Sequence, residues 1–149
     1  MPGLEELKRR SDWFERYVSR IDQTGSRAPA LDGRFACPCC GRPSLFVPAE
    51  YDICPICFWE DDGQDDPNAA EVWGGPNRDY SLAEARENFR EHGTMYRPAD
   101  RKRFEQQTAP DRKSFKRRLD AVYSRLALTE DESTRAELWR EEERVRRAR

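Results

Sequence analysis

Two short turns decide the fold of this chain: Cys37-Pro38-Cys39-Cys40-Gly41 and Cys54-Pro55-Ile56-Cys57-Phe58. Thirteen residues separate Cys40 from Cys54, so each turn can present two thiolates to one face while the segment between them folds back. Four cysteines at this spacing are what a tetrahedral zinc site requires. We therefore predict one structural zinc ion per chain, bound by Cys37, Cys40, Cys54 and Cys57.

The fifth cysteine falls outside this set. When the two turns are superposed, Cys39 coincides with Ile56, so we predict a free thiol at Cys39. Four protein ligands leave no open position for water, which favours a structural metal over a catalytic one. Two weaker alternatives are iron, because four thiolates also suit that metal, and redox chemistry at the vicinal Cys39-Cys40 pair.

The segment between the turns predicts a small β element. Residues 44–47 and 50–53 are rich in β-prone side chains and are separated by Pro48-Ala49, so they suit a short hairpin. We therefore expect an α+β fold, with a small zinc-ribbon-like core of two knuckles and a β-hairpin and with flanking α-helices. The expected domains are a helix and linker at 1–33, a zinc-binding domain at 34–93 and a charged helical extension at 94–149.

Apolar residues at helical spacing predict the flanking elements. Residues 4–21 form an amphipathic pattern, whereas residues 58–77 and 94–110 show no clear period. A capping box at Ser81–Glu84 begins a helix that Gly93 ends. From Asp111 one helix face carries a stripe of four residues, and a second capping box follows at 129–132. The stripe is Phe115, Leu119, Val122 and Leu126.

Charge separates the chain into unlike parts. Of the 149 residues 38% are charged, yet the formal net charge is only −2. Residues 37–93 carry 4 basic and 12 acidic side chains, and residues 94–149 carry 16 basic and 11 acidic ones. An acidic surface repels phosphate, so the middle segment is a poor nucleic-acid reader. Few branched aliphatic residues are present, and the thin core therefore needs a staple.

The compartment follows from what the sequence lacks. No stretch approaches 18 apolar residues, and residues 1–10 contain no apolar export signal. Cysteines in a chain without an export signal are expected to be reduced or metal-bound. We therefore expect a cytoplasmic protein without a membrane span.

The cysteine segment resembles a known family. The carrying motifs are Cys37–Gly41, Tyr51–Gly63, the Gly74-Gly75 pair with Asn77, and Ser81–Phe89. Together they resemble the bacterial cysteine-rich CPCC family over about residues 35–93. The resemblance implies a small metal-binding domain in a bacterial cytoplasmic protein, and it implies no reaction.

Other polar residues are weaker candidates. Clustered carboxylates at 60–66 suggest a solvated loop or a partner-binding surface. A second metal site or general acid–base catalysis is the weaker interpretation. The candidate partner-binding residues are Trp59, Glu60, Asp61, Asp62, Lys116 and Arg117. His92 is expected to cap its helix, and Asn77, Arg86 and Asn88 are expected to tie the loop to that helix.

These features favour a zinc-stapled, non-enzymatic module that binds another protein, as an adaptor or an immunity-type partner. The alternative is a nucleic-acid-binding zinc ribbon that uses the basic segment Arg97–Arg118. That segment contains Lys102, Arg103, Lys113, Lys116, Arg117 and Arg118. An enzyme that uses the acidic loop has the least support, because no catalytic constellation is visible.

Overall fold

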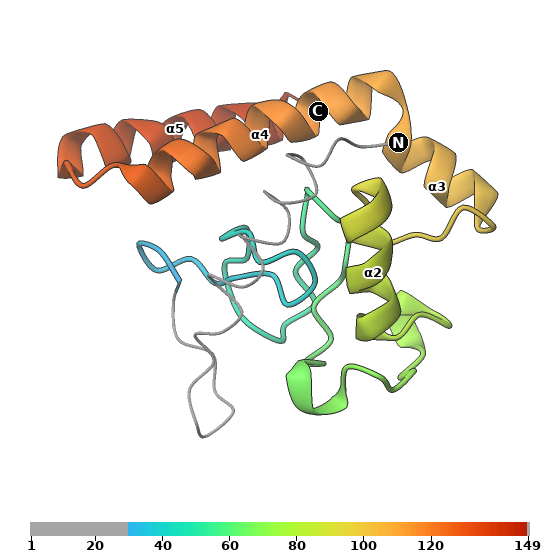
Figure 1. The fold of residues 1–149 in the computed structure, drawn as a ribbon. Coiled ribbons are helices and arrows are strands. Elements are labelled where there is room, and N and C mark those ends of the chain that lie inside the picture. The colour runs from blue at the N-terminus through green and yellow to red at the C-terminus, as the bar shows by residue number, and fades with distance from the viewer. Residues whose placement is uncertain (1–29, 149) are drawn as a thin grey trace.

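Helices dominate the part of the chain that the structure, a computed structural model, describes, namely residues 30–148 (Figure 1). The helix expected over residues 4–21 lies outside this part. The elements, in chain order, are the 3-10 helices η1 (Asp66–Asn68) and η2 (Gly75–Asn77) and the α-helices α2 (Leu82–His92), α3 (Arg101–Thr108), α4 (Pro110–Leu128) and α5 (Glu132–Arg147).

The predicted zinc-ribbon hairpin is wrong, and with it the α+β fold class. Residues 30–148 contain no strand and only isolated antiparallel bridges. Residues 44–47 and 50–53 do not form a ladder with each other. Instead Leu45 pairs across the first cysteine turn with Phe35, and Ile53 pairs across the second turn with Glu60.

Aspartate side chains explain why the hairpin does not form. The Asp52 carboxylate accepts hydrogen bonds from the backbone N–H groups of Phe46 at 2.9 Å and Val47 at 3.2 Å. The Asp61 carboxylate accepts the N–H of Ala49 at 2.7 Å. Side-chain acceptors of this kind compete with ladder hydrogen bonds for the same backbone donors. Each cysteine turn therefore closes a small loop of its own.

The boundaries of α2 confirm the capping prediction in part. The Ser81 hydroxyl accepts the N–H of Glu84 at 3.0 Å, and Gly93 ends the helix in a left-handed conformation with φ +79°. The Glu84 carboxylate does not complete a capping box. It accepts two hydrogen bonds from Arg97, at 2.7 Å each, and so ties α2 to the segment that follows it.

The predicted connector at 94–110 contains a helix, α3. Helix α3 ends at Thr108. The next residue, Ala109, has an extended ψ of 151°, which is the conformation that Pro110 imposes on the residue before it. Pro110 then occupies the first turn of α4, where its missing N–H costs nothing. Helix α5 is capped by Asp131, which accepts from Thr134, and not by the expected box at 129–132.

Helices α4 and α5 lie side by side in an antiparallel hairpin that covers the irregular segment and α2 (Figure 1). The predicted stripe of Phe115, Leu119, Val122 and Leu126 is buried, at most 4% exposed, so it packs internally. Its neighbours in one continuous core include the cysteines themselves. The helical hairpin and the cysteine turns thus share a single core.

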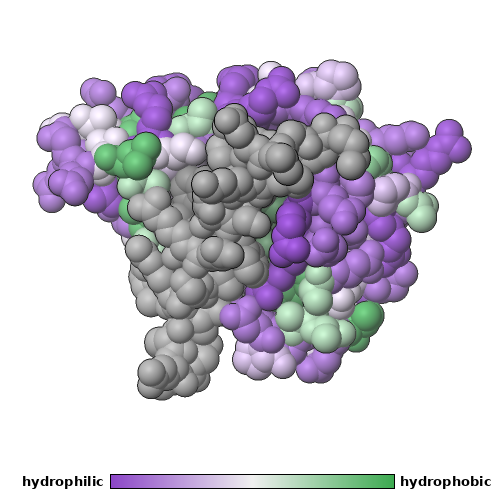
Figure 2. Space-filling view, in the orientation of Figure 1, coloured by the Kyte–Doolittle hydropathy of each residue, from purple (hydrophilic) through white to green (hydrophobic). Residues whose placement is uncertain are grey.

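The outer face is charged, as the composition requires. Outside the grey region, the visible surface is mostly hydrophilic, with small separate hydrophobic areas (Figure 2). None of the helices between residues 30 and 148 has the length and apolar character needed to cross a membrane.

Candidate metal centre

Each cysteine turn is closed by backbone hydrogen bonds at matching positions. In the first turn the N–H of Gly41 donates to the carbonyl of Cys37 at 2.8 Å, and in the second the N–H of Phe58 donates to that of Cys54 at 2.9 Å. Both donors lie in the left-handed region, with φ of +82° at Gly41 and +76° at Phe58. Glycine adopts this conformation at no steric cost, whereas phenylalanine does so under strain.

The two turns bring four sulfur atoms together. The Sγ atoms of Cys37, Cys40, Cys54 and Cys57 all lie within 4.8 Å of one another, and all four side chains are fully buried. The Sγ–Sγ distance is 3.5 Å between Cys37 and Cys57 and 3.6 Å between Cys40 and Cys54. A tetrahedral ion with metal–sulfur bonds of about 2.3 Å separates its ligand atoms by about 3.8 Å. These four cysteines therefore fit a four-thiolate metal site, as their spacing predicts.

Polar groups outside the ligand set point at the sulfur atoms. The Ser44 hydroxyl donates to Cys54 Sγ at 3.0 Å, and the backbone N–H of Trp59 donates to Cys57 Sγ at 3.4 Å. Hydrogen bonds to sulfur stabilise the thiolate form, which is the form that binds a metal. The chemistry of the donor set thus agrees with its geometry.

Burial acts to raise the pKa of all four thiols, and hydrogen bonding sets Cys54 apart from the others. Burial raises the pKa of Cys37, Cys40 and Cys57. Burial also acts to raise the pKa of Cys54, but hydrogen bonds from the neighbouring thiols and Ser44 outweigh it and lower that pKa well below its usual range. Burial thus opposes the thiolate form throughout the cluster, and hydrogen bonding favours it most at Cys54; a metal that binds here takes up deprotonated thiols.

Cys39 lies beside this group but is not among the four converging sulfur atoms. Its side chain is 1% exposed, and it makes no disulfide. Among residues 30–148 the cysteine cluster is the one group of three or more metal-ligand side chains close enough to hold an ion.

Arg42 joins the cysteine turns to helix α4. Its side chain is buried, donates from Nη1 to the carbonyl of Cys40 at 3.0 Å and forms a two-pronged ion pair with Asp120 at 2.9 and 3.1 Å. Neither residue was predicted from the sequence, because their 78-residue separation leaves no local signal. A lone arginine directly after a cysteine turn was the one available hint.

A buried carboxylate fixes helix α5 in the same way. Glu142 accepts hydrogen bonds from Arg34 at 2.6 and 3.1 Å, from the Tyr123 hydroxyl at 2.8 Å and from Arg146 at 3.0 Å. Arg146 also donates to the backbone carbonyl of Ser44, whose hydroxyl contacts Cys54 Sγ. The charged C-terminal helix is thereby connected to the cysteine cluster through a single intervening residue.

The predicted partner-binding residues of the acidic loop occupy different environments. Trp59 and Asp61 are fully buried and offer no surface to a partner in this structure. Glu60 and Asp62 are half-buried, and the Asp62 carboxylate accepts the N–H of Gln64 at 3.0 Å. Asp65 caps η1, so the carboxylates of this loop largely organise its own backbone.

The two predicted basic residues also differ from each other. Arg117 is exposed, whereas the Lys116 amine donates to the carbonyls of Gly93 at 3.2 Å and Gln107 at 3.1 Å. Burial lowers the pKa of Lys116 to about 8. A charge reversal at Lys116 would therefore disturb the fold and is unsuitable as a surface probe.

Of the remaining polar candidates, Arg86 and Asn88 hold loops to α2, as expected, whereas Asn77 joins two loop segments to each other. The Asn77 side chain exchanges hydrogen bonds with the backbone of Glu60, at 3.2 and 2.7 Å. Arg86 donates to the carbonyl of Pro38 at 2.9 Å, and Asn88 to that of Met95 at 2.9 Å. His92, in the last turn of α2, stacks edge-on against Phe104 of α3.

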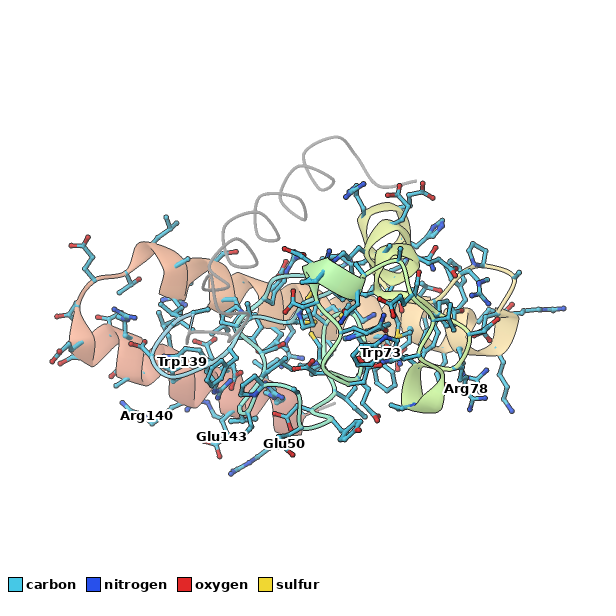
Figure 3. The ribbon with its side chains drawn as sticks, turned by 90° about the horizontal axis from the view of Figure 1, so that it is seen from below. Glu50, Trp73, Arg78, Trp139, Arg140 and Glu143 are labelled. Atoms are coloured by element: carbon cyan, nitrogen blue, oxygen red, sulfur yellow. The ribbon has the colours of Figure 1, made fainter. Side chains whose placement is uncertain are left out.

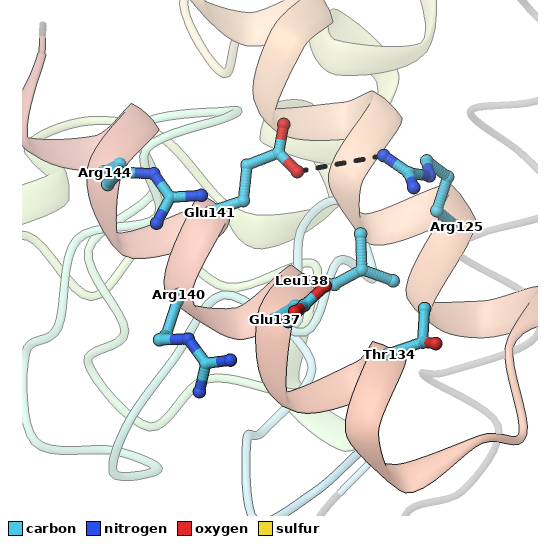
Figure 4. Close-up of a pocket in the computed structure, with 7 residues that line it drawn as sticks. All are labelled: Arg125, Thr134, Glu137, Leu138, Arg140, Glu141 and Arg144. Carbon is cyan, nitrogen blue, oxygen red and sulfur yellow. Dashed lines mark ion pairs between the residues drawn. The ribbon is translucent and has the colours of Figure 1, made fainter.

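Two hollows mark the surface of the helical hairpin. One, of about 350 Å³, has alternating arginine and glutamate side chains around Leu138, including the Arg125–Glu141 ion pair at 3.7 Å (Figure 4). The other, of about 730 Å³, lies beside Phe46 and Trp139, and the guanidinium group of Arg34 stands 4.0 and 4.5 Å from these two rings. Neither hollow gathers a set of catalytic groups.

The two cysteine turns bring together four buried thiols that could hold a metal ion. Residues 35–111 match the family model described as Cysteine-rich CPCC, which is more than half of the chain. The chain therefore belongs to the cysteine-rich CPCC family, as its motifs indicate. No curated protein and no solved structure matches it. The family match extends beyond the predicted boundary at residue 93 and through α3.

Proposed function

We propose that this protein is a zinc-stapled, non-enzymatic module of the bacterial cytoplasm that binds another protein. Zinc is the expected ion because four closely spaced thiolates form its usual structural site. The four sulfur ligands would fill the coordination shell. Once bound, such an ion supplies folding energy and no reaction.

One observation carries the interaction role. Seven large hydrophobic side chains are exposed between residues 30 and 148, and all but Leu128 belong to the loops at 46–73. Large exposed apolar side chains that come from neighbouring loops favour a surface that a partner covers. The six are Phe46, Val47, Tyr51, Ile53, Val72 and Trp73.

The nucleic-acid alternative has less support. Within the basic segment, Arg97, Arg101 and Arg103 form ion pairs with acidic side chains, and the Lys116 amine is bound to backbone carbonyls. Paired guanidinium groups contribute less to phosphate binding than free ones. The cations that stay exposed in this segment are Arg101, which pairs with Glu105, and Lys102, Lys113, Arg117 and Arg118.

Affinity capture from the native host, with and without nuclease, tests the proposal. We expect a protein to be retained after nuclease treatment. A titration of labelled DNA and RNA at two salt concentrations forms the second arm, with Lys113→Glu and Arg117→Glu combined on exposed positions of one helix face. Tight, salt-steep binding that this double variant abolishes would establish the nucleic-acid role instead.

A further inference from the structure

We propose that the loops around the metal centre form a docking face for a positively charged protein segment that also carries apolar side chains. The proposal rests on the interaction role proposed above and names its surface and the chemistry of its partner. We call this surface the acidic loop face. It consists of Glu50, Tyr51, Ile53, Glu60, Glu71, Val72 and Trp73.

The apolar members of this face are exposed to an unusual degree. Tyr51 is 57% exposed, Ile53 43%, Val72 57% and Trp73 46%. Aromatic side chains supply large contact areas at low entropic cost, and Tyr and Trp dominate the energetics of protein interfaces. Figure 3 shows Trp73 well apart from Trp139, Arg140 and Glu143 of α5, whereas Glu50 lies at the edge of the loops nearest Glu143.

Three observations place the two loops of the face side by side. Ile53 pairs with Glu60 across an antiparallel bridge, which sets these side chains next to each other. The Asn77 side chain binds the Glu60 backbone and so fixes the loop that carries Trp73. A Cβ atom added at Gly63 would lie 3.7 Å from both Ala49 and the Trp73 ring. Ala49 and the Trp73 ring therefore both lie beside Gly63, which brings the two loops next to each other.

The loop that presents Tyr51 is strained. Ala49 and Tyr51 both lie in the left-handed region, with φ of +58° and +66°. Asp61 holds this conformation: its carboxylate accepts the N–H of Ala49 at 2.7 Å, and its backbone carbonyl accepts that of Tyr51 at 2.9 Å. Non-glycine residues in this region are energetically unfavourable and cluster at binding and active sites. Buried Asp61 thus supports the face from beneath.

The negative charge of the acidic loop face favours a basic partner segment. Residues 43–77 contain eight acidic side chains and no lysine, arginine or histidine. Within the face, Glu50 and Glu71 are exposed and Glu60 is half-buried. Such a surface repels nucleic acid and attracts lysine and arginine. An arginine in the partner can also stack on the rings of Tyr51 and Trp73, which favours a segment that combines arginine with apolar residues.

The first test uses a synthetic probe. A twelve-residue peptide of alternating arginine and leucine is titrated into the full metal-loaded chain near physiological salt, where weak surface attraction is screened. One control peptide replaces arginine with glutamate, and the other replaces leucine with serine. We expect both controls to bind on the order of tenfold more weakly than the probe. Failure of the probe to bind, or equal binding of a control, would overturn the partner chemistry.

The second test locates the site. Tyr51→Ser combined with Trp73→Ser should weaken binding of the probe on the order of tenfold, whereas Leu128→Ser, at an 81% exposed position on α4, should leave it unchanged. Glu50→Lys should weaken binding, and Glu130→Lys, also exposed, should not. Metal content and circular dichroism verify that each variant is folded. Equal binding by the loop and control variants would reject this face.

The capture experiment distinguishes failure of the acidic loop face from failure of the protein-interaction role. In the nuclease-treated capture from the native host, a protein retained equally by wild type and by the Tyr51/Trp73 double variant would reject the acidic loop face and leave the interaction role standing. Capture that disappears with nuclease would reject the interaction role itself. Loss of the captured protein in the double variant, with retention in Leu128→Ser, supports both proposals.

Discussion

Arg42 shows how a single side chain couples the cysteine turns to the helices. It is 1% exposed, and its guanidinium group is shared between the Cys40 carbonyl and the Asp120 carboxylate. A buried guanidinium group that loses its carboxylate partner is costly, because it stays charged and cannot reach water.

We therefore predict that Asp120→Ala destabilises the protein by about 2 to 4 kcal/mol, below the largest such effects because Asp120 is itself 26% exposed. Glu130→Ala, at an exposed position beyond α4, is the control and should change stability by less than about 0.5 kcal/mol. Urea denaturation of both variants provides the comparison. Equal stability of Asp120→Ala and wild type would show that Arg42 needs no partner.

Among single residues, the four cysteines of the site were predicted best from the sequence. The spacing of the two turns was sufficient to select Cys37, Cys40, Cys54 and Cys57, because the geometry of each turn is local. The supporting residues could not be found in this way. Whether Trp59 and Asp61 are buried or exposed depends on packing from distant segments, which no local pattern encodes.

At the scale of elements, helix α5 is held by a buried carboxylate. Burial acts to raise the pKa of Glu142, but Arg34, the Tyr123 hydroxyl and Arg146 together lower it below its usual value. The Glu142 carboxylate therefore contributes stability that is fully present above the unfolded-state pKa of about 4.3. This contribution is lost as the pH falls through the lowered folded-state pKa.

Glu142→Gln should accordingly destabilise the protein by about 2 to 4 kcal/mol at neutral pH, because it leaves two arginines without their shared charge. The difference in thermal midpoint between wild type and variant should narrow between pH 5 and pH 3, as the wild-type carboxyl also becomes neutral. Calorimetry of both proteins at several pH values measures this difference in thermal midpoint. A difference that is constant with pH would mean that Glu142 acts through packing alone.

The elements were partly predictable. Ser81, Gly93 and the apolar stripe of α4 were identified from capping and periodicity, which are local signals. The hairpin failed because β propensity at 44–53 was overridden by the carboxylates of Asp52 and Asp61, which take the backbone donors. Helix α3 was missed because its short, polar sequence shows no apolar period.

At the scale of the whole molecule, the metal centre and the helical hairpin share one core. The cysteines lie in the same cluster of buried residues as Leu119, Val122 and Tyr123 of α4. Structural zinc contributes on the order of 10 kcal/mol of apparent binding energy in small peptides, and that energy becomes folding energy. Metal binding should therefore stabilise α4 as well as the cysteine turns.

Removal of the metal with a strong chelator should thus reduce amide hydrogen-exchange protection across residues 35–93 and also along the buried face of α4. Mass spectrometry of exchanged peptides resolves the two regions. Unchanged hydrogen-exchange protection in residues 35–93 after verified metal removal would contradict this prediction, because it would show that the segment folds without the metal. Loss restricted to these residues would show that the hairpin is stable by itself.

The most direct test of this account is the metal content of the freshly purified chain. Elemental analysis should find one zinc ion per wild-type molecule, retained in Cys39→Ser and lost in Cys54→Ser. The matched pair is informative because both side chains are buried and only Cys54 belongs to the converging set. A wild-type protein without bound metal, or a Cys54→Ser variant that keeps a full equivalent, would contradict the four-cysteine metal centre.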